Sequence, residues 1–502
     1  FEKNINKKLN ESNEELKQFR SAQTEAFPSP VPTQIISNGE FTPSAQTKEQ
    51  SQVEARIKQL ADDYGKKQGL SRREFLGSAS GMAAAFLAMN EVFGTMFMVN
   101  NVEAAEPEQA IARANSLQDQ FIFDDQTHFV HDDFKADGLL NLPRFAADHW
   151  GAGLTREQIS LSDLKFQNYI RQIFLNSDTK VALLSGAPFD DPSWWFLAND
   201  QIHDAVESIN KLAGTRRMYG HFVITPKQDG WMDEVDKVLE SGHTDSWKAY
   251  TIGDPLTSTT KYPWRLDDEE LMYPFYEKAV KAGITNLAIH KGLMPADYET
   301  SWPEVWKHAS AWDIGKAAKD WPEMNFIIYH ACLRPAFELP DKALAEFEAT
   351  GEIKWASDLA HIPEEYGVDN VYADLGTCFA NSATANPRFA AALLGTLIKG
   401  LGDDHVVWGT DSVWYGSPQW QIEALRRLEI PEDMQKKHGF APLGPADGIV
   451  KNNIFGLNTS KLYKFDPTVA MQAVKNDVIT GLKQKFTNNF KLRDNERYGY
   501  II

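Results

Sequence analysis

The sequence predicts an α/β protein, a (β/α)8 TIM barrel with an N-terminal disordered or signal-like region and a C-terminal helical extension. From about residue 121, short β-branched or aromatic runs alternate with amphipathic helical stretches, the pattern of repeated βα units around a parallel sheet. Eight such runs occur, which is the strand number of a small closed barrel. Several runs end on His or Asp, where a barrel of this kind carries its active-site residues.

The predicted elements follow in chain order. The strands are expected at Phe121–Thr127, Lys180–Leu184, Met218–Ile224, Ala249–Ile252, Asn286–Ile289, Phe326–Tyr329, Val371–Leu375 and Val406–Gly409. The helices between them are expected at Trp194–Leu212, Met232–Glu240, Leu271–Ala282, Asp341–Thr350 and Gln419–Leu428. A doubly wound open sheet is the competing architecture, but no Gly-rich phosphate loop follows the first strand. The closed barrel is therefore preferred.

Composition divides the chain into four parts. Residues 1–70 are polar and are predicted to be largely disordered, with a weak helical stretch around Val53–Tyr64. Residues 71–104 form a signal-like segment, and residues 105–466 contain the metal-dependent barrel. Residues 467–502 are expected to form a helical extension.

The signal-like segment resembles a twin-arginine export signal. It contains S-R-R-E-F-L at 71–76, a small-residue apolar run over Gly77–Met89, and V-E-A at 102–104 before Ala105. We therefore expect a periplasmic or otherwise exported protein that uses the twin-arginine export machinery. The alternative is a buried helix preceded by two surface arginines. The run is shorter than the ~20 residues of a spanning helix, so no stable membrane insertion is expected.

Charge and cysteine content limit the partners. The net charge of −19 argues against nucleic acid and against docking on an anionic membrane. With 42% hydrophobic residues the chain can bury a substantial core. Its two cysteines, Cys332 and Cys378, are expected to be free buried thiols, with a single disulfide as the alternative.

Five residues at predicted strand ends can ligate a divalent metal ion. They are Gln126, His128, His290, His330 and Asp411. One such residue is most often a hydrogen-bonded structural group. Four suitable residues at four strand ends favour a site, because parallel strands bring these ends to the same face of a barrel.

The stretch from Phe121 to Asp466 resembles the amidohydrolase superfamily, specifically its amidohydrolase-2 branch of metal-dependent hydrolases and non-oxidative decarboxylases. In that branch the first strand ends in His-x-His, the fifth and sixth strands each end in His, and the eighth ends in Asp within G-[ST]-D. The matching positions are Gln126 and His128, His290, His330, and Asp411 within Gly409-Thr410-Asp411. The resemblance implies one divalent metal ion, expected to be Zn²⁺. It places His330 beside the metal as acid or base, and Asp411 on the metal or accepting the proton of the attacking water.

Gln126 departs from the family pattern. An amide oxygen is a poorer donor to Zn²⁺ than an imidazole, and Mn²⁺ or Mg²⁺ would tolerate it better. Three outcomes are open. Gln126 ligates through oxygen, the metal is held by His128, His290 and Asp411 with water, or no metal binds.

Residues for substrate binding are sought in the loops after the strands. Arg334 follows His330 by four residues and could hold a carboxylate with its guanidinium fork. Trp194, Trp414 and Tyr415 could supply aromatic walls. These residues suggest a small cyclic or aromatic acid or ester as substrate.

Three functions remain as hypotheses. The leading one is a metal-dependent hydrolase that acts on a carbonyl-type bond through metal-activated water. The alternative is a decarboxylase of a small aromatic acid, a carbon–carbon lyase with the same constellation of residues. The third is an exported binding or scaffold protein without catalysis. The resemblance also makes a homodimer a candidate assembly.

Overall fold

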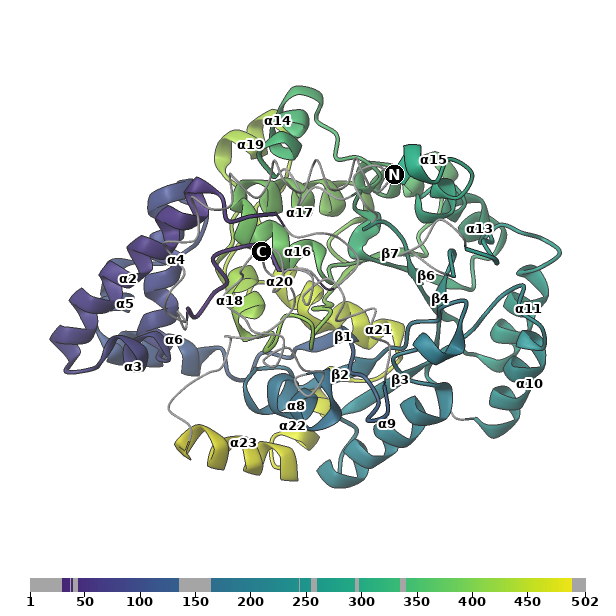
Figure 1. Cartoon of the computed structure of the whole chain (residues 1–502), viewed down its shortest axis with the longest axis horizontal. Coiled ribbons are helices and arrows are strands. Elements are labelled where there is room, and N and C mark those ends of the chain that lie inside the picture. The colour runs from purple at the N-terminus through teal and green to yellow at the C-terminus, as the bar shows by residue number, and fades with distance from the viewer. Residues whose placement is uncertain are drawn as a thin grey trace, which may run out of the picture.

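An eight-stranded parallel sheet forms the centre of the molecule, with its strands in the order β1 to β8 (Figure 1). The computed structural model describes residues 29–36, 38, 44–134, 164–242, 244–253, 260–293, 298–334 and 340–489. The strands are β1 Phe123–Thr127, β2 Val181–Leu184, β3 Met218–Val223, β4 Ser246–Tyr250, β5 Asn286–His290, β6 Asn325–Tyr329, β7 Val371–Asp374 and β8 Val406–Val407.

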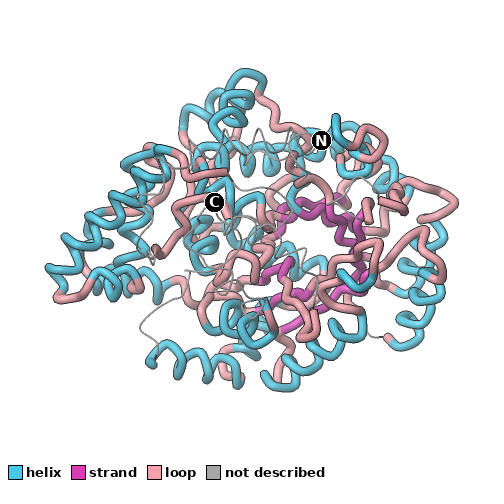
Figure 2. Tube along the Cα trace, viewed as in Figure 1, coloured by secondary structure: helices cyan, strands magenta, loops and turns pink. Residues whose placement is uncertain are grey.

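The sheet closes between its first and last strands. The backbone N–H of Asp125 donates to the carbonyl oxygen of Trp408 at 2.7 Å, and the N–H of Asp411 donates to the carbonyl of Gln126 at 2.9 Å. Figure 2 shows the strands as a ring with helices around it. The predicted TIM barrel is therefore confirmed.

Every strand is followed by at least one helix that covers the outside of the barrel. In chain order, the helices after β1 to β5 are α8 Phe166–Ile170, α9 Asn199–Ala213, α10 Trp231–Ser241, α11 Tyr273–Ala282 and α13 Ile314–Asp320. Strand β6 is followed by α14 Pro340–Thr350 and α15 Ala356–Tyr366, β7 by α16 Cys378–Ala385 and α17 Pro387–Leu401, and β8 by α18 Gln419–Arg427. Left-handed glycines end several of them, for example Gly214 after α9 and Gly283 after α11.

Each predicted strand overlaps an observed one, and β4 differs most. It begins at Ser246, whereas the sequence pattern predicts a start at Ala249. Lys248 interrupts the apolar pattern, yet its side chain is fully buried inside the barrel, 3.4 Å from the centre of the Tyr329 ring. The first predicted helix also begins later, at Asn199, because Pro192–Trp194 form a separate 3-10 turn.

Five helices on one side of the barrel form what we call the N-terminal arm (Figure 1, purple). They are α2 Lys48–Gln68, α3 Arg72–Leu76, α4 Ala79–Phe93, α5 Asn101–Ala105 and α6 Pro107–Ser116. The helix α2 is longer than the stretch predicted at 53–64, because a Thr47–Gln50 capping box begins it and left-handed Gly69 ends it.

The signal-like segment lies within this arm. Helix α4 contains most of the apolar run and is largely buried, whereas Arg72 and Arg73 are exposed. This geometry agrees with the buried-helix alternative, while export and cleavage stay predictions. Among the described helices, none combines the length and apolar character required to cross a bilayer.

Buried ion pairs attach the N-terminal arm and the C-terminal helices to the barrel. Arg427 of α18 donates to Glu103 of the arm at 3.0 Å and to Glu423 at 3.2 Å. Arg217, next to β3, donates to Asp477 at 2.6 Å. Asp477 lies between two helices of the predicted C-terminal extension, α22 Pro467–Val474 and α23 Val478–Asn489. The four-part division of the chain stays a prediction.

Both cysteines, Cys332 and Cys378, are buried and free, as predicted.

Replacing Arg427 with Met should destabilise the protein strongly. The substitution leaves Glu103 buried without its main cation and removes one cation from Glu423. Breaking a buried pair in this way costs about 3–5 kcal/mol. Urea unfolding of wild type and variant measures the loss. Lys436→Met breaks an exposed pair with Glu432 and should leave the unfolding midpoint unchanged. Equal midpoints for Arg427→Met and wild type would contradict the attachment of the arm through this pair.

Candidate active site at the carboxyl end of the barrel

The five predicted ligands all lie buried at the carboxyl ends of their strands. Gln126 is in β1, His128 follows it, and His290 ends β5, while His330 follows β6 and Asp411 follows β8. Each of the five side chains is only 1–2% exposed. The structure arranges them in two hydrogen-bonded groups, one around Asp411 and the other formed by His290 and His330.

The Asp411 carboxylate accepts hydrogen bonds on both oxygens. Its Oδ1 lies 3.1 Å from His128 Nε2 and accepts from Gln126 Nε2 at 3.0 Å. Its Oδ2 accepts from Asn38 Nδ2 at 3.0 Å and from the Thr377 hydroxyl. Burial by itself would raise the pKa of Asp411, but His128, His330 and the Thr377 hydroxyl together outweigh it, so the pKa is lowered. The carboxylate is therefore ionised at neutral pH.

The position of one proton on His128 follows from its partners. His128 Nδ1 lies 2.8 Å from the carbonyl oxygen of Ser185. A carbonyl oxygen only accepts, so Nδ1 carries a hydrogen. The contact between Nε2 and the Asp411 oxygen then needs a second proton on Nε2 or a cation between the two atoms. In the first case the pair is an imidazolium–carboxylate ion pair.

His290 and His330 form the second group and are both neutral at pH 7. Burial lowers the pKa of His330 to about 4, and it lowers the pKa of His290 well below its usual value. His330 Nδ1 donates to the Gly376 carbonyl at 2.9 Å, which leaves the lone pair on Nε2. That Nε2 lies 3.1 Å from His290 Nδ1, so His290 donates there. The ring of Tyr250 stacks on His290 at 4.3 Å.

Left-handed backbone occurs at the two residues expected to carry chemistry. The φ angle is 61° at His330 and 57° at Asp411, and Thr377, which donates to Asp411, also has a φ of 57°. Such angles are costly for residues other than glycine and cluster at functional sites. The surrounding hydrogen bonds hold these residues in place.

A distant segment of the chain reaches this site. Asn38, which contacts Asp411, precedes the N-terminal arm in sequence. Nearby Ile35 is fully buried, and the N–H of Ile36 donates to Asn381 of α16 at 3.3 Å. No pattern in the sequence indicates this contact, because residues before 70 read as a polar tail.

The donor atoms have the chemistry that a divalent metal ion needs, but they are not gathered into one cluster. Among the described residues, no three His, Cys, Asp or Glu side chains are grouped to hold a metal ion. His128 and His330 each place Nδ1 on a backbone carbonyl, which is a common arrangement of metal-binding His residues. Gln126 Oε1 is buried and has no hydrogen-bond partner in the described structure. To bind the ion, Asp411 Oδ1 would have to give up its contact with any proton on His128 Nε2.

Two further acids lie inside the barrel beneath the site and were not predicted. Burial raises the pKa of Asp125 in β1 and of Asp374 in β7 well above the usual range. Both carboxyl groups are therefore protonated over a wide pH range. Each has a carboxyl oxygen without a hydrogen-bond partner in the described structure. Lys248 lies close enough to lower the pKa of both acids in part.

The predicted substrate-binding residues differ in their surroundings. Arg334 forms a two-point ion pair with Glu299, at 3.0 and 2.6 Å, so its fork already holds a protein carboxylate. The Trp414 ring stacks on the His128 ring, with 5.8 Å between the ring centres. The Tyr415 hydroxyl lies 2.8 Å from the Thr377 hydroxyl. Both aromatic residues are buried.

The remaining predicted residue, Trp194, belongs to the 3-10 turn of residues 192–194, and its side chain lies outside the described part of the structure.

Comparison with protein families gives one match. Residues 253–465 match the model of the amidohydrolase family, Amidohydro_2. The matched region contains His290, His330 and Asp411, whereas Gln126 and His128 precede it. The match supports the amidohydrolase-2 resemblance for the second half of the barrel. No curated protein matches the sequence.

Several solved structures are similar to the chain. An uncharacterized TIM-barrel protein, Bb4693, from Bordetella bronchiseptica has 13% identity and a TM-score of 0.42 over 70% of this chain and 99% of that one. The 5-carboxyvanillate decarboxylase LigW from Sphingomonas paucimobilis has 15% identity and a TM-score of 0.39 over 69% and 100%. The 2,6-dihydroxybenzoate decarboxylase from Rhizobium has 12% identity and a TM-score of 0.40 over 69% and 99%.

The neutral state of His330 should be visible in the acid stability of the protein. Its folded pKa is about 4, against 6.5 for an ordinary His, so the unfolded chain binds the extra proton first as pH falls. Stability is therefore lost from about pH 6.5 down to pH 4, by about 3 kcal/mol from this group.

The matched variant is His330→Asn, because Asn tolerates the left-handed φ and can still donate to Gly376. Between pH 7 and pH 4, its free energy of urea unfolding should fall by about 3 kcal/mol less than that of wild type. Parallel pH dependences for the two proteins would show that His330 is not held neutral.

Substitution of Asn38 with Asp should destabilise the site at neutral pH. A second carboxylate would face Asp411 Oδ2 in place of an N–H donor, at a cost of about 3 kcal/mol or more. The introduced carboxyl group would have a raised pKa in the folded protein. The loss of stability should therefore be present at pH 7 and should be relieved near pH 4, where this group is protonated. Asn38→Ala only removes the donor and should cost about 1–3 kcal/mol with little pH dependence. Identical unfolding curves for the two variants at pH 7 would contradict the Asn38–Asp411 contact.

Proposed function

We propose that the chain is a metal-dependent hydrolase of the amidohydrolase-2 type. It would act on a carbonyl-type bond of a small cyclic or aromatic acid or ester. The observation that carries the proposal is a neutral His330 beside a buried ionised Asp411, at the end of the barrel where catalytic residues lie. The family match over residues 253–465 supports the same class.

The residues that would hold the metal are His128, His290 and Asp411. Gln126 would add its amide oxygen, which has no other partner among the described residues. We propose Zn²⁺, with Mn²⁺ or Mg²⁺ as the alternatives that an amide ligand favours. A bound ion would lower the pKa of a coordinated water and polarise a substrate carbonyl.

His330 is the residue proposed for proton transfer. Its Nδ1–H is fixed on the Gly376 carbonyl, so Nε2 is the atom that accepts a proton from water. In the structure that lone pair is occupied by the His290 Nδ1–H, and water has to replace this donor before transfer. A pKa of about 4 keeps His330 in its base form at neutral pH. Hydrolysis needs this form, whereas protonation of a ring carbon in a decarboxylase needs an acid.

Aromatic surroundings support a cyclic or aromatic substrate. Trp414 lies against His128, and Tyr250 lies against His290, so flat apolar surfaces adjoin both groups of the site. For Arg334 to bind a substrate carboxylate, its pair with Glu299 would have to open. We therefore propose aromatic packing as the main source of substrate recognition.

We further propose that an exported form keeps the N-terminal arm. Cleavage after Ala104 would remove Glu103, which neutralises the buried Arg427, and it would remove Asn38 from Asp411. Loss of either contact leaves a buried charge less well paired. The intact mass of the protein recovered from its native compartment tests this proposal, and a mature chain beginning near residue 105 would contradict it.

Turnover assays on the full chain test the proposed reaction. Purified protein supplied with Zn²⁺ or Mn²⁺ is screened against esters, lactones and aromatic acids, with separate detection of released carbon dioxide. We expect hydrolysis that His330→Asn reduces about 10²–10⁴-fold, because a general base contributes about that much. The matched control is His405→Gln, at the opposite end of the barrel, which should keep the wild-type rate.

Other outcomes of the turnover assays would change the proposed reaction or the role of His330. Release of carbon dioxide from aromatic acids without hydrolysis would replace the hydrolase by the decarboxylase. Full activity in His330→Asn would overturn the assignment of the base. No turnover of any substrate, with folded and metal-loaded protein, would favour the non-catalytic binding protein.

A further inference from the structure

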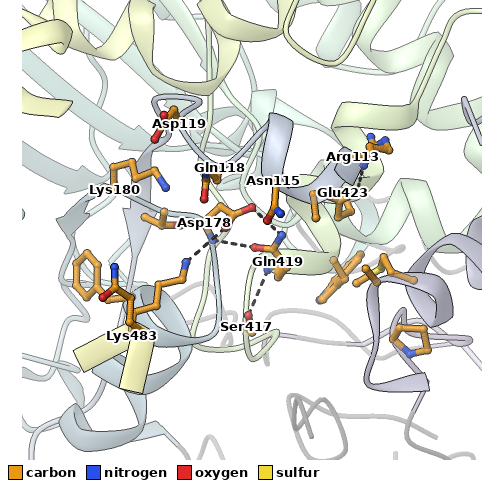
Figure 3. Close-up of a pocket in the computed structure, with 18 of the residues that line it drawn as sticks. Arg113, Asn115, Gln118, Asp119, Asp178, Lys180, Ser417, Gln419, Glu423 and Lys483 are labelled. Carbon is orange, nitrogen blue, oxygen red and sulfur yellow. Dashed lines mark hydrogen bonds and ion pairs between the residues drawn. The ribbon is translucent and has the colours of Figure 1, made fainter. Parts of the chain in front are cut away.

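A cavity lies where the N-terminal arm, the barrel and the C-terminal helices meet (Figure 3). Its volume is about 730 Å³, within the range of sites for small molecules. None of the residues placed in the candidate active site lines it. Lys180, which lines the cavity, immediately precedes β2 and so lies at the amino end of that strand. The active-site residues lie at the carboxyl ends of their strands.

The cavity is positively charged in a protein that is strongly negative. Its described lining contains seven Lys or Arg and four Asp or Glu side chains, while the whole chain has a net charge of −19. A local excess of cations on an acidic protein attracts small anions.

The carboxylates of the lining are already paired with basic side chains. Asp178 accepts from Arg426 at 2.7 Å, and Asp119 lies 3.1 Å from Lys475. Glu423 accepts from Arg113 at 2.8 Å (Figure 3). These acids are therefore not available to balance another cation.

This pairing leaves Arg73, which is exposed to solvent, and Lys180, which is partly buried. In the described structure the Lys180 ammonium group has no hydrogen bond and no ion pair, and Figure 3 shows it facing the same space as Gln118. The pKa of Lys180 is lowered to about 8, mainly by burial. Asp178 opposes this lowering, whereas the neighbouring Lys483, Arg426 and Arg217 add to it. A bound anion would supply the missing partner.

The rest of the lining is a mixture of polar and apolar residues, and three of the apolar ones are Phe174, Met471 and Ile479. Phe174 and Ile479 are almost fully buried, and Met471 adds a flexible apolar side chain. An inorganic anion would leave these surfaces without contacts, whereas an organic molecule with one charged end would use both parts of the cavity.

We propose that this cavity binds a small organic carboxylate, with its charged end at Lys180 and its apolar body against Phe174, Met471 and Ile479. The side-chain amide of Gln118 lines the same cavity and can donate to the carboxylate. The site is separate from the proposed hydrolase site, and its ligand need not be a substrate.

Calorimetric titration of the full chain with hexanoate tests the proposal. We expect one site for hexanoate, with affinity reduced at least tenfold in Lys180→Met because a charged hydrogen bond is lost. Lys180→Arg should keep most of the binding. The uncharged analogue hexanamide should bind weakly and equally to wild type and Lys180→Met. Inorganic phosphate should bind more weakly than hexanoate.

Two control variants separate this site from other basic groups and from the barrel. Lys475→Met removes a lysine of the same cavity that already pairs with Asp119, and hexanoate affinity should change less than threefold. Asp411→Asn should also keep hexanoate binding. Thermal unfolding verifies that each variant is folded, and Lys180→Gln replaces Lys180→Met if the latter is not.

Four results would overturn the proposal. They are no binding of hexanoate to wild type at millimolar concentration, equal affinity in the charge-removing Lys180 variant, loss of binding in Asp411→Asn, and phosphate binding as tight as hexanoate.

Discussion

Closure of the sheet between β1 and β8 is the constraint on which the rest of the site depends. The N–H of Asp411 donates to the Gln126 carbonyl at 2.9 Å, and the N–H of Val413 donates to the His128 carbonyl at 3.1 Å. These bonds join segments that are almost 300 positions apart in the sequence. They hold the Asp411 carboxylate against the His128 ring, so the 3.1 Å contact between the two side chains follows directly from the closure of the barrel.

A buried carboxylate must have donors around it, since burial without them would cost several kcal/mol. Here the donors come from β1, from the loop after β7 and from the segment before the N-terminal arm. A divalent ion held by both His128 and Asp411 would replace a proton shared by the two side chains, and its binding would then release that proton. The segment that carries Asn38 is therefore part of the site. His290 and His330 carry no charge that has to be balanced, because burial lowers their pKa values and keeps both rings neutral.

Local patterns in the sequence were sufficient for the barrel and for the donors at its strand ends. The start of β4 was predicted too late because Lys248 looks like a surface residue, although barrel interiors can bury a lysine beside acids and a tyrosine ring. Asn38 could not be predicted, because it lies 373 positions from Asp411 and no local pattern encodes such a contact. The pairing of Arg334 with Glu299 was missed for the same reason. The apolar run after Arg73 is compatible with a signal or with a buried helix, and the structure packs it as a helix.

Exchange of a proton for a metal ion at Asp411 can be measured by metal titration. Chelator-treated full-length protein is titrated with Zn²⁺ in two buffers of different ionisation enthalpy, which gives metal bound and protons released per chain. We expect about one ion bound and about one proton released near neutral pH, with both lost in the His290→Ala, Asp411→Ala double variant. Folded wild-type protein that binds neither Zn²⁺ nor Mn²⁺, or binds without releasing a proton, would contradict this expectation.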